Sequence, residues 1–457
     1  NNRTVIFDAF HRKNPCDGGY SISCGLDQVI DYINNLHFTE DDITYLRSLN
    51  IFDEDFLEYL ANFKFTGDIY AIPEGSVMFP KEPIVKVIAP IMEAQLVETA
   101  ILNIINHQSL IATKAARVCY AAQGDGIMEF GLRRAQGPDA GIYGARAAVI
   151  AGCIGTSNVL AGQMFNIPVK GTHAHSWIMS FPDEYTAFKT YADLYPNACI
   201  LLVDTYDTLR SGVPNAIKVF TEMRNAGIEL KGYGIRLDSG DLAYLTKKAR
   251  KMLDNAGFED AIISASSDLD EYLIDSLKTQ GAQITSWGVG TNLITSKDNP
   301  AFGGVYKLAA VMGDDGKFIP KIKVSENSEK ITNPGNKTVY RVYDTNGMIK
   351  ADLITLADEK YDETEPLLLF DPIETWKKTL LEPGEYTMRE IMVQVFKNGE
   401  CVYTTPEVMD IQAYCKKELA TVWDETKRLI NPQEVHVDLS KPLYDIKHEL
   451  LNNYGRD

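Results

Sequence analysis

Two histidines, His173 and His175, are the first candidates for a reactive centre in this chain of 457 residues. They lie in the run Gly-Thr-His-Ala-His-Ser at 171–176, which we expect at a strand or strand end, so that both imidazoles point to one side. Such a pair can bind a metal ion, or one imidazole can act as nucleophile or acid–base while a carboxylate orients it. Asp204 ends the next predicted strand and is a suitable orienting carboxylate. A metal cage needs further ligands, and no later histidine falls within the strand region.

A glycine-rich turn after another predicted strand offers a site for phosphate. Its residues Gly288, Gly290 and Thr291 belong to the run Gly-Val-Gly-Thr-Asn. Backbone N–H groups exposed by such a turn can bind phosphate oxygens, although a tight turn without a ligand explains the pattern equally well. The run lacks the lysine of a P-loop and the spacing of a dinucleotide fingerprint, so neither site is indicated.

Three charged residues are candidates for holding an anion or a sugar. Arg133 lies beside glycines in the run 130–138, where an arginine can clamp a diphosphate or a carboxylate, or be plain surface charge. Arg236 and Asp238 alternate along a predicted strand and therefore point the same way. Together they can bind an anion and a sugar hydroxyl, and the alternative is an ion pair that lines the interior of a barrel.

The elements that would position these side chains alternate between short apolar strands and helices. Strands are predicted at 200–204, 234–238, 261–265 and 284–287, and helices at 214–226, 241–255 and 269–280. This alternation is typical of parallel strands with right-handed crossovers, and polar residues directly after each strand favour a barrel. Other runs alternate apolar and polar residues and indicate antiparallel strands at 67–72, 82–88, 338–344 and 391–404.

The expected fold class is therefore α/β, an irregular parallel α/β barrel plus a second, mainly antiparallel α+β domain built from N- and C-terminal segments. The expected boundaries are 1–115 for the N-terminal part of the α+β domain, 116–310 for the barrel, 311–405 for the return strands and 406–457 for a helical C-terminal tail. A chain of this length exceeds what one hydrophobic core usually supports.

Composition narrows the class of partner. The formal net charge of −18 disfavours nucleic acid and anionic membranes, because both need a positive protein surface. The seven cysteines are scattered and never spaced as Cys-x-x-Cys, so neither disulfides nor a structural zinc is indicated. No apolar run is long enough for a bilayer, and the polar first residues show no signal peptide. We expect a cytoplasmic enzyme that acts on small molecules.

Five motifs together resemble the nicotinate phosphoribosyltransferase family. They are Phe-Gly-Leu-Arg-Arg-Ala-Gln-Gly-Pro-Asp at 130–139, Gly-Thr-Ser-Asn-Val-Leu-Ala-Gly at 155–162, Gly-Thr-His-Ala-His-Ser at 171–176, Arg-Leu-Asp-Ser-Gly-Asp at 236–241 and Gly-Val-Gly-Thr-Asn-Leu at 288–293. The resemblance implies ATP-assisted coupling of nicotinate to 5-phosphoribosyl 1-diphosphate. The products would be nicotinate mononucleotide and diphosphate, on a route to NAD. It also implies a homodimer, and Mg²⁺ bound through the diphosphate rather than by side chains.

The resemblance further implies the roles of the reactive and sugar-binding residues. His175 would be phosphorylated by ATP, and Asp204 would orient it. Asp238 would bind the ribose hydroxyls, and the glycine turn with Gly290 and Thr291 would bind the 5-phosphate. The family's Asp-x-Tyr segment, whose tyrosine stacks on the pyridine ring in the partner subunit's site, would precede the first residue.

The nicotinate pocket would be formed by four residues. The resemblance implies that Thr172 and Arg236 hold the carboxylate and that Arg133 contacts substrate phosphate or the pyridine. Ser157 stands where related nicotinamide-using enzymes carry an aspartate, and a neutral residue favours the acid because a carboxylate would repel nicotinate. Two other functions stay open, a metal-dependent barrel hydrolase and a sugar-phosphate binding protein without activity.

Overall fold

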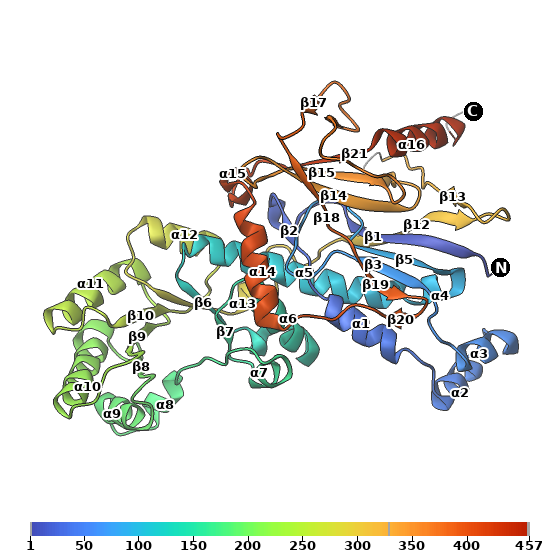
Figure 1. Ribbon diagram of the computed structural model, residues 1–457. Coiled ribbons are helices and arrows are strands. Elements are labelled where there is room, and N and C mark those ends of the chain that lie inside the picture. The colour runs from blue at the N-terminus through green and yellow to red at the C-terminus, as the bar shows by residue number, and fades with distance from the viewer. Residues whose placement is uncertain (1, 328–329, 455–457) are drawn as a thin grey trace. The chain divides into compact units, whose positions relative to one another are not determined.

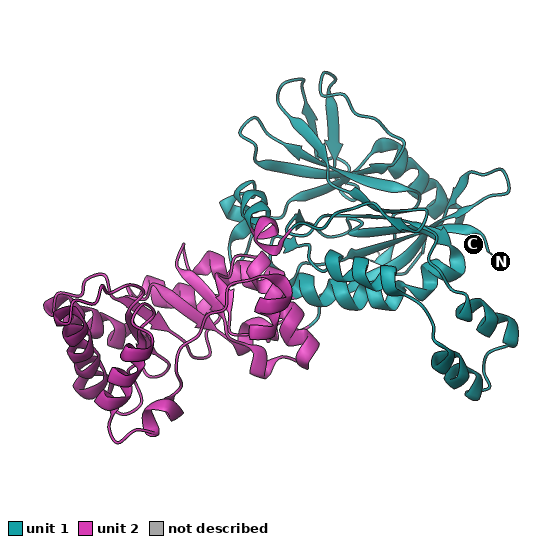
Figure 2. Cartoon of the chain, turned by 60° about the horizontal axis from the view of Figure 1, so that its bottom comes forward, with its two compact units in different colours: residues 1–110, 301–406, 413–457 teal, residues 111–300, 407–412 magenta. Residues whose placement is uncertain are grey.

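A computed structural model describes residues 2–327 and 330–454 of the chain. The chain divides into two compact units (Figure 2). Unit 1 comprises residues 1–110, 301–406 and 413–457, and unit 2 comprises residues 111–300 and 407–412. Unit 2 is therefore an insertion between two long parts of unit 1, with one short return late in the chain.

Unit 2 is built around a sheet of six parallel strands (Figure 1). In sheet order the strands are β7 (Gly155–Thr156), β6 (Gly126–Glu129), β11 (Ser286–Val289), β10 (Ile262–Ala265), β9 (Gly234–Leu237) and β8 (Ile200–Leu202). Every ladder between them is parallel, as expected for strands joined through helices. The α/β class expected from the alternation of strands and helices is confirmed.

The helices of unit 2 follow its strands along the chain. They are α6 (Pro138–Ile150), α7 (Val159–Phe165), α8 (His175–Met179), α9 (Glu184–Leu194), α10 (Val213–Asn225), α11 (Leu242–Asn255), α12 (Glu271–Thr279) and α13 (Thr291–Ile294), with the 3-10 helix η2 (Leu132–Arg134) and the π-helical turn η3 (Thr208–Gly212). Two acidic residues that follow strands cap helices: Asp241 accepts from Tyr244 N at 3.0 Å, and Asp270 accepts from Leu273 N at 2.7 Å. These carboxylates stabilise the starts of α11 and α12.

The two outer strands of this sheet, β7 and β8, are joined by an irregular segment, 168–173. Within the described part of the chain, no ladder connects β7 directly to β8. Thr156 N donates to Pro168 O at 3.0 Å, and Lys170 N donates to Thr156 O at 2.9 Å, so the segment runs along β7. At its other end, His173 Nε2 accepts from the backbone N–H of Leu202 in β8 at 3.3 Å. The imidazole of His173 therefore connects the segment 168–173, which lies along β7, to strand β8.

Unit 1 contains two larger sheets. The first has the order β13 (Phe318–Pro320), β12 (Gly304–Met312), β1 (Thr4–His11), β5 (Val85–Pro90), β3 (Asp68–Ala71), β19 (Val393–Lys397) and β20 (Glu400–Cys401). All its ladders are antiparallel, as predicted for the runs 67–72, 82–88 and 391–404. A two-residue hairpin turn joins β19 and β20, with positive φ at Asn398 and Gly399 as such a turn requires.

The second sheet of unit 1 brings distant segments together. Its order is β18 (Thr387–Glu390), β14 (Lys337–Tyr343), β15 (Ile349–Leu356) and β21 (His436–Leu439). Two short ladders, β2 (Ser21–Ile22) with β4 (Val77–Met78) and β16 (Leu367–Phe370) with β17 (Lys378–Leu381), complete the strands. The helices are α1 (Leu26–Asn35), α2 (Glu40–Ser48), α3 (Glu54–Ala61), α4 (Ile91–Leu96), α5 (Glu98–Ala121), α14 (Val408–Ala420), α15 (Asp424–Lys427) and α16 (Lys441–Tyr454), with the 3-10 turn η1 (Pro15–Asp17). Of these, α5 and α14 each have residues in both units.

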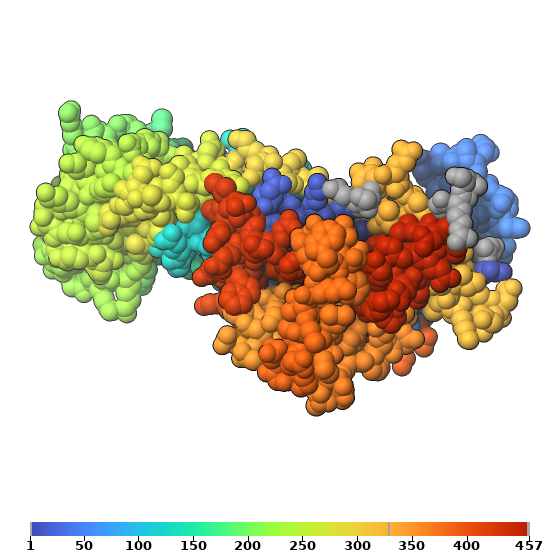
Figure 3. Space-filling model, turned by 90° about the horizontal axis from the view of Figure 1, so that it is seen from above, coloured from blue at the N-terminus to red at the C-terminus, as the bar shows by residue number. Residues whose placement is uncertain are grey.

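The C-terminal segment differs from the helical tail expected for 406–457. It holds α14, α15 and α16, but also β21, which pairs in parallel with β15. Figure 3 shows α16, in dark red, against the orange segment that contains β16, and the ring of Tyr444 packs on Phe370 with centroids 5.2 Å apart. From residue 413 on, the segment therefore belongs to unit 1, and Leu439 and Leu443 are buried in the unit 1 core.

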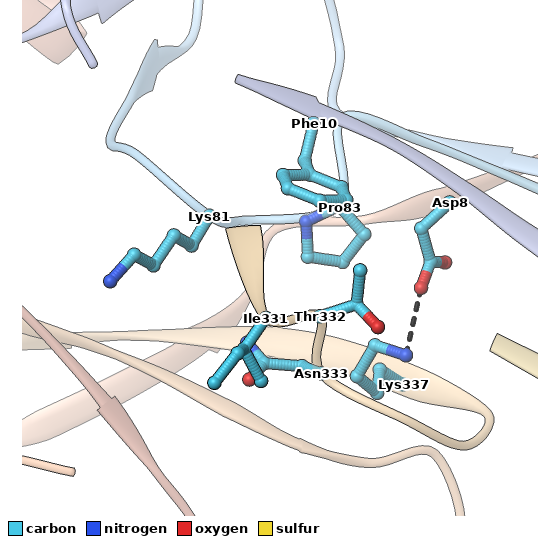
Figure 4. A pocket seen from close by; sticks show the side chains of 8 residues that line it. All are labelled: Asp8, Phe10, Lys81, Pro83, Ile331, Thr332, Asn333 and Lys337. Atoms are coloured by element: carbon cyan, nitrogen blue, oxygen red, sulfur yellow. Dashed lines mark ion pairs between the residues drawn. The ribbon is translucent and has the colours of Figure 1, made fainter. Parts of the chain in front are cut away.

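A buried ion pair links the two sheets of unit 1 beside a small cavity (Figure 4). Asp8 of β1 contacts Lys337 Nζ, at the start of β14, at 2.8 Å. Lys86 Nζ donates to Lys337 O at 2.7 Å, and burial lowers the pKa of Lys86 to about 8. Loss of either partner of such a pair leaves an uncompensated buried charge.

Among residues 2–327 and 330–454, no helix is long and apolar enough to cross a membrane.

Candidate active site

His175 is the first residue of α8 and not part of a strand. Ala174 before it is extended, with φ −100° and ψ 167°, and the chain then turns into the helix. The expectation that His173 and His175 share one side is therefore wrong, because strand alternation ends between them. The His175 side chain is 38% exposed, whereas His173 is buried against Tyr191, with ring centroids 4.6 Å apart.

His173 does not offer its Nε2 to a metal ion beside His175. Its Nε2 is occupied by the backbone N–H of Leu202. Burial lowers the pKa of His173 to about 4, so the ring is neutral and accepts this hydrogen bond. His173 therefore holds the segment 168–173 against β8, and His175 is left as the imidazole that solvent and ligands can reach.

His175 lies among three polar side chains from the carboxyl ends of β8 and β9. Its Nδ1 is 3.0 Å from Thr205 Oγ1. Its Nε2 is 3.8 Å from Asp204 Oδ1 and 3.8 Å from Asp238 Oδ2. Two carboxylate oxygens therefore face Nε2. Thr205 was not among the predicted site residues, and its only sequence signal is that it follows Asp204.

The Asp204 carboxylate is held rigidly from one side. Its side chain is 2% exposed. Oδ2 accepts from Asp238 N at 2.8 Å and from Ser239 Oγ at 2.7 Å. Oδ1 is buried and has no hydrogen-bond partner within the described residues, and it is this oxygen that faces His175. A fixed, desolvated carboxylate oxygen next to an imidazole is suited to stabilise charge that develops on the ring.

A second polar network surrounds Arg236, the third residue of β9. Its guanidinium donates to Thr172 Oγ1 and, through Nε, to Ser266 Oγ at 3.0 Å. Ser266 in turn donates to Asp238 Oδ1 at 2.5 Å. Burial lowers the pKa of Arg236, the nearby carboxylates oppose this, and the positive charge of Arg133 adds to the lowering. The network presents a buried cation and hydroxyls to a small anion, and Ser266 is a member that the strand pattern alone did not indicate.

The remaining predicted residues lie at the carboxyl ends of β6, β7 and β11. Arg133 is exposed in η2, directly after β6, and Ser157 is partly buried after β7. Gly290 caps α13, whose first residue is Thr291. Gly288 lies under Phe130, since a Cβ added to Gly288 would be 2.6 Å from the phenyl ring. All six strands of the sheet therefore contribute groups at the same end, as in barrel enzymes.

Comparisons with known proteins cover nearly the whole chain. Models of the nicotinate phosphoribosyltransferase N-terminal domain, family and C-terminal domain match residues 1–106, 126–344 and 336–447. A nicotinate phosphoribosyltransferase of Bacillus subtilis is 48% identical over 451 residues, which is 98% of this chain and 91% of the relative. One of Dictyostelium discoideum is 36% identical and covers 98% and 84%. The crystal structure of human nicotinic acid phosphoribosyltransferase superposes with a TM-score of 0.84 at 27% identity, covering 98% and 96%.

Proposed function

Because this chain belongs to the nicotinate phosphoribosyltransferase family and is an enzyme of that class, we propose that ATP drives its reaction through phosphorylation of His175. The substrates would be nicotinate and 5-phosphoribosyl 1-diphosphate, and the products nicotinate mononucleotide and diphosphate, for NAD biosynthesis. The observation that carries the proposal is the accessible Nε2 of His175 between two carboxylates, opposite a nitrogen already engaged by Thr205.

We assign Nε2 of His175 as the phosphoryl acceptor. With the proton on Nδ1, that nitrogen donates to Thr205 Oγ1, and the lone pair of Nε2 is free to attack. Nε2 attacks the γ-phosphorus of ATP, the bond to the β–γ bridging oxygen breaks, and ADP leaves with that electron pair. Asp204 stabilises the positive charge on the phosphorylated ring. Water later cleaves the N–P bond, which restores His175 and releases inorganic phosphate.

The nicotinate carboxylate is assigned to the network around Arg236. The guanidinium donates to the hydroxyl of Thr172, which itself donates to His173 O at 3.3 Å. A carboxylate can accept from both groups once this hydroxyl turns toward it. Ser157 and Arg133 are assigned to the pyridine side. Because Ser157 is neutral, it adds no like charge that would repel the acid, which supports nicotinate over nicotinamide.

The phosphoribosyl group is assigned to Asp238 and to the turn after β11. Asp238 would accept from the ribose hydroxyls, while the backbone at Gly288 and Gly290 and the hydroxyl of Thr291 would bind the 5-phosphate. The pyridine nitrogen attacks the anomeric carbon as the bond to diphosphate breaks. Mg²⁺ bound through the diphosphate supplies charge neutralisation for this leaving group. No side chain is assigned as a ligand of this ion; the carboxylates of Asp204 and Asp238 give this end of the sheet the negative charge that suits a hydrated cation.

A coupled assay tests the proposal directly. Purified enzyme would be given nicotinate, nicotinamide or quinolinate with 5-phosphoribosyl 1-diphosphate, Mg²⁺ and ATP. We expect turnover with nicotinate, and acid-labile labelling of the protein by γ-labelled ATP that is absent in His175→Ala. The control His37→Ala changes an exposed histidine of unit 1 and should retain both. Full ATP-coupled turnover in His175→Ala would refute the phosphohistidine.

We also propose a cytoplasmic homodimer. Large apolar side chains of unit 2 are exposed on and near α7, including Val159 at 69% and Met164 at 49%, and a second copy of the chain would cover them. Cys119, Cys153, Cys199 and Cys401 form no disulfide, which supports a reducing compartment. Light scattering of the purified chain measures the oligomeric state, and a monomer for both wild type and Val159→Asp would contradict the dimer.

A further inference from the structure

Glu129, the last residue of β6, is a fully buried carboxylate next to the pyridine side of the site. One carboxylate oxygen accepts from Gly131 N, and the other accepts from Thr156 Oγ1 at 2.6 Å. Burial raises the pKa of Glu129, and the two donors oppose this increase. Burying a carboxylate in a parallel sheet is costly compared with an apolar residue, so its presence calls for a role beyond packing.

The two donors belong to different loops. Gly131 lies in the loop that leads from β6 to Arg133, and Thr156 is the last residue of β7, directly before Ser157. The backbone of Glu129 adds a third link, since its carbonyl accepts from Ser157 N at 3.0 Å. A single residue therefore ties together the loops that carry both residues assigned to the pyridine.

The loop after β6 is packed closely against α13 at Gly131. A Cβ added to Gly131 would lie 2.4 Å from Cβ of Ile294 in α13, so the backbone of Gly131 is pressed against that helix. The hydrogen bond from Glu129 holds the same residue from the other side. The loop position is therefore set jointly by the contact with Ile294 and by the Glu129 carboxylate.

We propose that Glu129 is a positioning residue for nicotinate binding, which sets the distance between Arg133 and Ser157 by holding Gly131 N and Thr156 Oγ1. The inference rests on the proposed function of these two residues. Glu129 does not touch the substrate. Its effect is on nicotinate affinity rather than on ATP-dependent phosphorylation, because the groups around His175 belong to β8 and β9 and have no contact with Glu129 among the described hydrogen bonds.

Kinetics of Glu129→Gln, Thr156→Val and the double variant test the proposal. Glutamine has the same shape but cannot accept from both donors, so the KM for nicotinate should rise about 10- to 100-fold, the factor that matches one lost hydrogen bond to a charged group. kcat and the KM for 5-phosphoribosyl 1-diphosphate should change less than about threefold, and the double variant should resemble either single one, since both remove the same link. Glu184→Gln is the matched control, because Glu184 is also a buried unit 2 carboxylate that accepts from two side chains, Ser211 and Asn215.

Hydrogen exchange of the free enzyme separates this inference from the proposed function. Peptides that span 130–134 and 155–158 should exchange faster in Glu129→Gln than in wild type or Glu184→Gln. Unchanged exchange in those peptides, an unchanged nicotinate KM, or additive effects in the double variant would each overturn the positioning role. If the wild type itself turned over no nicotinate, the proposed function would fail, while the exchange result would still decide whether Glu129 holds the two loops.

Discussion

Replacement of His173 tests how the segment 168–173 is held against β8. Its Nε2 satisfies the backbone N–H of Leu202, which is completely buried. In His173→Phe, that N–H loses its acceptor inside the protein, at a cost of about 1–3 kcal/mol of unfolding free energy. His173→Gln offers a carbonyl oxygen in place of Nε2 and should recover most of this loss. Turnover should follow the same order, because the segment leads directly to His175.

The pH dependence of stability gives a second, independent measure. Burial lowers the pKa of His173 from its ordinary value of 6.5 to about 4 in the folded protein. Between these pH values the unfolded chain binds a proton that folded His173 does not, so stability falls as the pH falls through this window, by about 3 kcal/mol in total. Neither variant has this group, so the slope of their unfolding free energy against pH should be smaller by about 1.4 kcal/mol per pH unit.

Urea unfolding at several pH values, followed by circular dichroism, measures this slope. The buried His11 of unit 1, whose pKa burial also lowers to about 4, titrates in all three proteins and cancels in the comparison. Hydrogen exchange of the peptide that contains Leu202 locates the effect, with faster exchange expected only in His173→Phe. Equal slopes for wild type and His173→Gln would refute the assignment of His173 as a neutral buried acceptor.

Three further predictions concern single sites. Asp204→Asn weakens the charge stabilisation of the histidine beside it, and we expect kcat to fall about 100-fold or more with little change in melting temperature, measured by the coupled assay and calorimetry. In Gly288→Ala the added methyl would lie 2.6 Å from the ring of Phe130 and force the ring away. We expect urea unfolding to show a loss of about 1–3 kcal/mol in unfolding free energy. An unchanged value would show that the ring moves freely. Burial and the neighbouring Asp352 raise the pKa of Glu82 well above its ordinary value, so a neutral amide of the same shape should be tolerated there. Glu82→Gln should therefore change the unfolding free energy by less than about 1 kcal/mol in urea unfolding, and a larger loss would contradict this expectation.

The parallel strands and their helices were predictable because their signals are local. Runs such as 200–204 and 234–238 are short, apolar and followed by helical patterns, and the structure has β8 and β9 there. Strand β21 was missed because its residues pair with residues of β15 that lie 85 positions earlier in the chain (Ala351 with His436), and this pairing leaves no trace in the local pattern. The prediction of a strand at the histidine motif was wrong because it assumed that side chains alternate through the whole motif. In the structure α8 begins at His175, in the middle of the motif.

Residues of the site were predictable where charge and strand position coincide. Arg236, Asp238 and Asp204 follow from the rule that polar groups gather at the carboxyl ends of parallel strands, and the structure brings them together. Thr205 and Ser266 were missed because hydroxyl residues are common after strands, and only the fold decides which of them reaches a neighbour. Which of these side chains meet depends on how the six parallel strands are arranged next to one another, and no single segment of the sequence encodes that arrangement.

During synthesis, the first sheet of unit 1 cannot be completed until the unit 2 segment 111–300 has been translated. Strand β1 pairs early with β5 on one side, but its other side pairs with β12, where Val5 lies opposite Val311. At translation rates of about 5–20 residues per second, roughly 15 to 60 s separate the synthesis of these two strands. All six strands of the unit 2 sheet have been made by residue 289, before β12 exists. The nascent chain therefore carries an open edge of β1 while all six strands of the unit 2 sheet are already synthesised, and a chaperone that shields strand edges would act on unit 1.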